Sequence, residues 1–96
     1  MGERRRAIGA KRDQIGALAR RHRARSIALF GSAARGDDTS ASDADFLVEF
    51  EDGSSLFDLM HLADDLESLL GFDVDVVSVG GLKERDEHIR QEAVPL

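Results

Sequence analysis

The sequence of 96 residues contains no cysteine, which excludes disulfide bonds and thiolate metal ligands. It contains no apolar run near the roughly 20 residues that a membrane-spanning helix needs, and no apolar signal segment before the first expected helix. It also lacks internal repeats, linkers and low-complexity segments. We therefore expect residues 1–96 to form one domain in the cytoplasm, with no membrane partner.

The charge is distributed unevenly along the chain. The net charge is −6, yet residues 1–25 carry nine Lys and Arg against two acidic residues, and the remaining chain carries four basic and seventeen acidic residues. Because a nucleic-acid binder presents a basic surface, the acidic body argues against direct nucleic-acid binding. The basic segment could attract an anion, an acidic partner or the body itself, or form a solvated helix face.

The spacing of apolar residues predicts alternating helices and strands. Ile8, Ile15 and Leu18 indicate an amphipathic first helix. A later helix, over 56–70, is expected to have Ser54 or Ser55 as its N-cap and to end at Gly71. In chain order we expect a helix over 3–23, strands over 26–30 and 43–50, a helix over 56–70, a strand over 72–79 and a helix over 82–94. This order predicts an α/β (α+β) fold, with a small mixed sheet of three or slightly more strands and flanking helices.

Two of these elements have a predicted inner face. In the strand at 43–50, even-numbered and odd-numbered residues should face opposite sides of the sheet. In the helix at 56–70, one apolar stripe should form the core: Leu56, Leu59, Met60, Ala63, Leu66 and Leu70. The last two strands are joined through this helix, a connection long enough for them to be parallel.

Three aspartates mark two of the predicted strands. Asp43 and Asp45 leave the same face of one strand, roughly 7 Å apart, and Asp75 lies mid-strand between two valines, where aspartate is disfavoured. Carboxylates so placed repel one another unless a cation lies between them, and hard oxygen ligands suit Mg²⁺. The alternative is that the first two only cap a turn. Asp73 lies at a strand start and is expected to face solvent.

Gly31 and Ser32 stop the first strand. A glycine there lets the backbone approach a ligand closely, and a helical turn starting at Ser32 would offer free N–H groups to an anion, although Ser32 could be a simple N-cap. Arg35 could contact a phosphate, point into solvent or pair with Asp37 or Asp38. The three histidines, His22, His61 and His88, show no ligand spacing and are expected to be surface or helix-face residues and not catalysts. No P-loop, GxGxxG motif or nucleophile–base pair is present.

Taken together, Gly31-Ser32, Asp43-Ala44-Asp45 and the later Asp75 resemble the DNA-polymerase-β-like nucleotidyltransferase superfamily. The segments "FGSAARGDDTSASDADFLVEFE" and "LLGFDVDVVSVGGLKERDEHIRQEAVPL" are similar to the minimal nucleotidyltransferase (MNT) proteins, which are often antitoxins paired with a HEPN ribonuclease toxin. The resemblance covers about residues 25–96, so residues 1–24 would form a basic helix ahead of a catalytic core.

The resemblance implies a role for each matching residue. Gly31 and Ser32 would hold the phosphates of ATP. Asp43, Asp45 and Asp75 would be catalytic and would ligate two Mg²⁺ ions, with Asp75 nearest the attacking hydroxyl.

The implied reaction moves AMP from ATP onto a hydroxyl of a cognate HEPN toxin, expected to be that of a tyrosine, and thereby neutralises the toxin. Alternatives are a non-catalytic antitoxin that only binds its toxin, and a small-molecule nucleotidyltransferase. So small a chain is expected to borrow its acceptor surface from a partner or from a second copy, as a homo-oligomer.

Overall fold

The sheet is mixed and has four strands. A computed structural model describes residues 3–35, 43–81 and 91–96, and its strands follow the order β3-β2-β1-β4. The central strand β1 runs antiparallel to β2 and to β4, whereas β2 and β3 are parallel. The strands are β1 (Ala24–Phe30), β2 (Ala44–Phe50), β3 (Val74–Ser78) and β4 (Val94–Pro95). The predicted mixed α/β sheet and the parallel pair are therefore confirmed.

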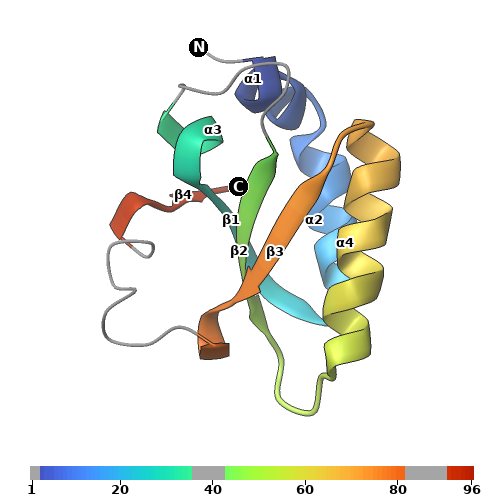
Figure 1. The fold of residues 1–96 in the computed structure, drawn as a ribbon. Coiled ribbons are helices and arrows are strands. Elements are labelled where there is room, and N and C mark those ends of the chain that lie inside the picture. Colours follow the sequence, from blue (N-terminus) through green and yellow to red (C-terminus); the bar gives the residue numbers. More distant parts are fainter. Residues whose placement is uncertain (1–2, 36–42, 82–90) are drawn as a thin grey trace.

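Two longer helices form a layer against the sheet. α2 packs on β1 and α4 on β3, while α1 and α3 lie at the end of the sheet where β2 begins (Figure 1). The helices are α1 (Glu3–Ala10), α2 (Arg12–Arg21), α3 (Gly31–Arg35) and α4 (Leu56–Leu70), and a 3-10 turn, η1 (Val79–Gly81), follows β3. The core lies between the two layers, and its largest fully buried side chains are Phe46, Ile8, Ile15, Leu29, Leu62, Leu66 and Val48.

The alternation predicted for β2 is confirmed. Ala44, Phe46 and Val48 are fully buried beneath the helices. Asp45 and Glu49 leave the opposite face and are half-buried, because successive side chains of a strand point to opposite sides. The sheet thus turns its carboxylates away from the helical layer.

The prediction of one helix over 3–23 was wrong. The helix breaks at Lys11, whose N–H bonds the carbonyl of Ile8 and whose Nζ lies 2.7 Å from the carbonyl oxygen of Leu69 on α4. Gly9 weakens the helix just before this point. The second half ends at Arg21, and Arg23 takes a positive φ of 67°, which reverses the chain directly into β1.

The predicted helix at 56–70 is confirmed as α4. Gly71 ends it with a left-handed φ of 81°, and the N–H of Ser55, its N-cap, donates to the carboxylate of Asp58. The predicted core stripe was wrong for Leu56 and Met60, which are 69% and 50% exposed. The face of α4 that carries Leu62 and Leu66 packs on the core. Met60 points away from it, because at 3.6 residues per turn it lies about 200° around the axis from Leu62.

The C-terminal segment differs from its prediction where the structure describes it. Residues 82–90 of the expected helix lie outside the described residues. Val94 and Pro95 form β4 opposite Leu29 and Ala28, so the helix does not reach residue 94. Pro95 lacks an N–H and is tolerated because β4 is an edge strand. Among the described helices, none is long and apolar enough to cross a membrane.

Candidate active site

Two of the predicted carboxylates meet at the end of the sheet where β2 and β3 begin. Asp45 is the register partner of Asp75 on the parallel strand β3 and of Phe30 on the antiparallel strand β1. Adjacent strands lie about 4.8 Å apart, and register partners direct their side chains to the same face. The fold therefore places Asp45 and Asp75 side by side and brings the end of β1 against them.

The electrostatics of this group act on Asp45. Burial raises the pKa of its carboxyl above the ordinary value, repulsion by Asp75 and then by Asp43 raises it further, and the guanidinium of Arg35 lowers it. Desolvation and like charges both disfavour an ionised carboxyl. The three aspartates singled out from the sequence thus share one electrostatic environment in the folded chain.

Gly31 closes the site from the side of β1. Its φ is 75°, and a Cβ built there would lie 2.5 Å from Oδ2 of Asp45. A side chain at this position would strain the backbone and displace the carboxylate. The first residue of α3 therefore has to be glycine for the end of β1 to approach Asp45 so closely.

The helical turn predicted after Gly31 is present as α3, and it includes Ser32. The side chain of Ser32 lies outside what the structure describes. Its role in holding phosphate stays a prediction, as does that of Gly31.

The three aspartates supply the kind of oxygen donors that a metal site uses. Within residues 3–35, 43–81 and 91–96, no group of three or more Asp, Glu or His side chains is arranged to hold a metal ion. Asp45 and Asp75 are adjacent, whereas Asp43 is exposed just before β2. Their oxygen donors and mutual repulsion fit Mg²⁺ in kind, so ligation by Asp43, Asp45 and Asp75 remains a prediction.

Arg35 has a partner that the sequence did not indicate. Its Nη1 lies 3.4 Å from Oε2 of Glu92, and both side chains are nearly half exposed. The two residues are 57 positions apart, and no spacing rule connects them. Asp37 and Asp38, considered as partners of Arg35, lie outside the described residues.

The described histidines belong to the helical layer rather than to this site. Nε2 of His22 lies 2.6 Å from Oδ2 of Asp65, and the His22 ring lies 6.3 Å from that of His61. The side chain of His22 is only 15% exposed and bridges the end of α2 to α4, as a residue on a helix face. His88 lies outside the described residues.

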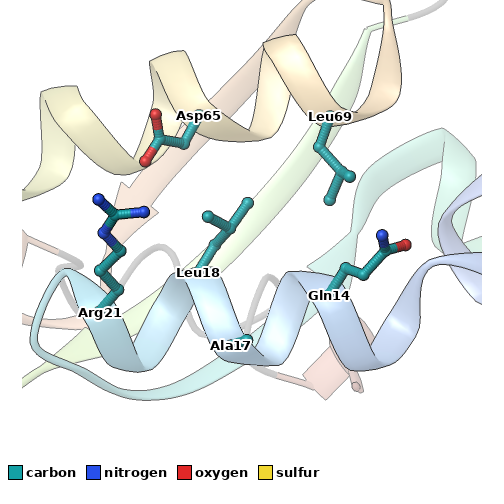
Figure 2. Close-up of a pocket in the computed structure, with 6 residues that line it drawn as sticks. All are labelled: Gln14, Ala17, Leu18, Arg21, Asp65 and Leu69. Carbon is teal, nitrogen blue, oxygen red and sulfur yellow. The ribbon is translucent and has the colours of Figure 1, made fainter.

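A hollow of about 430 Å³ separates the same two helices (Figure 2). Its walls come from α2 and α4, and none of the predicted site residues is among them. The lining residues are Gln14, Ala17, Leu18, Arg21, Asp65 and Leu69. The paired carboxylates of Asp45 and Asp75 therefore remain the candidate active site.

Comparison with known proteins shows the family of the chain. The model of the nucleotidyltransferase domain family matches residues 11–94. Protein adenylyltransferase MntA of Thermococcus cleftensis is 44% identical over 66 residues, which cover 69% of this chain and 67% of that protein. A candidate protein adenylyltransferase of Methanocaldococcus jannaschii is 42% identical over 62 residues, which cover 65% of this chain and 67% of the relative.

Solved structures show the same fold. One described as a candidate minimal nucleotidyltransferase superposes with a TM-score of 0.87 at 43% identity and covers 96% of this chain and 95% of its own. A toxin–antitoxin complex with AMP-PNP reaches 0.64 at 32% identity, over 74% of this chain and 59% of that chain. A complex of a tri-AMPylated HEPN toxin of Shewanella oneidensis with an MNT antitoxin contains a chain that superposes with a TM-score of 0.59 at 27% identity. The match covers 78% of this chain and 58% of that chain.

The family match spans most of the chain and includes the end of β1 and both carboxylate-bearing strands. The chain therefore belongs to the nucleotidyltransferase domain family and is a nucleotidyltransferase of the minimal, MNT type.

Proposed function

We propose that this protein transfers AMP from ATP to a hydroxyl group of a HEPN toxin and thereby neutralises the toxin. The observation that carries the proposal is that Asp45 and Asp75 are register partners on β2 and β3, with Gly31 at the end of β1 lying directly against the carboxylate of Asp45. Support comes from relatives that are named protein adenylyltransferases and from similar chains that occur in toxin–antitoxin complexes, one with AMP-PNP and one with an AMPylated toxin.

In the proposed reaction, the oxygen of the acceptor hydroxyl attacks the α-phosphorus of ATP. A new oxygen–phosphorus bond forms as the bond to pyrophosphate breaks, and Asp75 accepts the proton of the hydroxyl. Asp75 suits this role because it is exposed and lies beside Asp45. Gly31 lets the end of β1 approach Asp45 closely, and Gly31 and Ser32 in α3 would contact the phosphates.

In the proposed reaction the carboxylates would also bind the metal ions. Asp43, Asp45 and Asp75 would hold Mg²⁺, which would neutralise the charge that develops on the phosphates. Without a cation, burial and repulsion hold the pKa of Asp45 above its ordinary value. An Asp pair that repels in the free protein therefore favours binding of a cation together with the nucleotide.

Mass spectrometry of the cognate HEPN toxin after incubation with ATP and Mg²⁺ tests the proposal. We expect the mass of the toxin to increase by one or more AMP groups. The increase should disappear when the acceptor tyrosine of the toxin is replaced by Phe, with no other residue modified in its place. A toxin of unchanged mass with the wild-type protein would refute the transfer reaction.

A double substitution separates catalysis from binding. Asp43→Ala with Asp45→Ala should abolish the mass shift and the neutralisation of the toxin. Asp64→Ala, which alters an exposed carboxylate of α4, is the matched control and should leave both intact. If neutralisation survives the double substitution, the protein acts as an antitoxin by binding alone.

A further inference from the structure

The basic helix α1 contacts the body of the protein, one of the alternatives that the sequence left open. It spans Glu3–Ala10 and therefore lies outside residues 11–94, which the family model matches. Ile8 anchors it, because this side chain is fully buried in the common core. The helix lies close to α3, at the end of the sheet that holds the carboxylates (Figure 1).

One arginine of α1 holds the turn that follows β1. Nη1 of Arg5 donates to the carbonyl oxygen of Ala34 at 2.5 Å, across 29 residues of sequence, and the contact is partly buried. The acceptor belongs to α3, which has only five residues. Helices this short are not stable by themselves, so a charged donor from outside contributes to fixing α3 and the Gly31 turn at its start.

Two further basic residues contact the end of α4 and the segment that follows it. The guanidinium carbon of Arg4 lies 4.0 Å from the ring centroid of Phe72, a geometry that favours a cation–π interaction. Nζ of Lys11, just after α1, bonds the carbonyl of Leu69. Phe72 and Leu69 flank the end of α4 and lead into β3, which carries Asp75. The α1 segment thus contacts both α3 and the segment that leads into β3.

We propose that Arg5 is a positioning residue for the nucleotide: it holds the carbonyl of Ala34 and thereby fixes α3 and Gly31 against Asp45. The inference rests on the proposed function, because α3 is the element expected to contact the phosphates. It assigns α1, a segment beyond the matched family domain, to the active site. A displacement of about 1 Å at a substrate-positioning group can reduce a rate by roughly 100-fold.

The test compares three variants of the full chain. Arg5→Met removes the donor and keeps an apolar stem, Arg5→Lys keeps a donor on a shorter group, and Arg6→Ala removes an exposed arginine from the same helix as the control. Hydrogen exchange of residues 31–35 is measured without nucleotide. Pyrophosphate release with the cognate toxin then gives KM for ATP and kcat separately.

We expect faster exchange in residues 31–35 and a roughly tenfold or greater increase in KM for ATP in Arg5→Met, with partial recovery in Arg5→Lys and wild-type values in Arg6→Ala. Unchanged exchange and KM in Arg5→Met would overturn the role of Arg5. An equal loss of protection throughout the chain would also overturn it, since that is general unfolding. A wild-type protein that transfers no AMP would instead refute the proposed function, while the exchange data would still report on α3.

Discussion

Replacing Asp45 by Asn should make the protein more stable and inactive. The change keeps the shape of the side chain and removes one of two carboxylates that are register partners on β2 and β3. Like charges directly opposite on neighbouring strands destabilise a sheet by roughly 0.2–1 kcal/mol. Since 1 kcal/mol shifts the Tm of a domain of this size by about 4–8 °C, we expect Tm to rise by roughly 1–8 °C at pH 7.

The gain should depend on pH in a defined direction. The pKa of Asp45 is raised in the folded protein above the ordinary value of 3.8, by burial and by the charges of Asp75 and Asp43. The folded state therefore binds the proton more tightly than the unfolded state, and stability falls as the pH rises from 3.8 through the raised pKa. The advantage of Asn should be complete at neutral pH and disappear below pH 3.8.

Thermal unfolding followed by circular dichroism at pH 7 and at acidic pH measures this effect. Glu49→Gln is the matched control, since Glu49 lies on the same face of the same strand and should show little change. Addition of Mg²⁺ should raise the Tm of the wild type more than that of the Asn variant. A lower Tm for Asp45→Asn at pH 7, or a gain of equal size at acidic pH, would refute the argument.

Further substitutions test the site and the core. Gly31→Ala and Gly71→Ala each place a side chain at a positive φ and should cost about 1–2 kcal/mol of unfolding free energy. Only Gly31→Ala should also abolish nucleotide transfer. The reason is that its Cβ would meet Asp45, whereas a Cβ at Gly71 would meet no atom within 4 Å. Phe46→Ala, in the core, should cost about 3–5 kcal/mol in urea unfolding, whereas Phe57→Ala, at a side chain 68% exposed, should change it by less than about 0.5 kcal/mol. Loss of nucleotide transfer in both glycine variants, or equal losses of unfolding free energy in the two phenylalanine variants, would contradict the geometry and burial described.

Local chemistry explains which features could be predicted from the sequence. The alternation of β2 follows from the two-residue period of a strand, and the end of α4 follows from the conformational freedom of Gly71. The candidate site could be predicted because aspartate is rare within strands and Asp75 therefore stands out. Each of these signals lies within a few residues of the feature that it predicts.

Other features could not be predicted because they depend on partners far away in the sequence. The break at Lys11 involves a carbonyl 58 residues away, and the pair of Arg35 with Glu92 spans 57 residues. The exposure of Met60 depends on which line of α4 faces the sheet, although its apolar character suggested burial. No periodicity within one element contains this information.

The sequence by itself determined strands β1 to β3, helix α4 and the residue types of the candidate site, since helix and strand periods, glycine stops and the rarity of carboxylates in strands act locally. Only the tertiary structure decided that Asp45 and Asp75 are register partners, that Gly31 closes against Asp45 and that Arg5 reaches Ala34. The physical reason is that strand register and helix docking are set by burial of the shared core, which joins residues from the whole length of the chain.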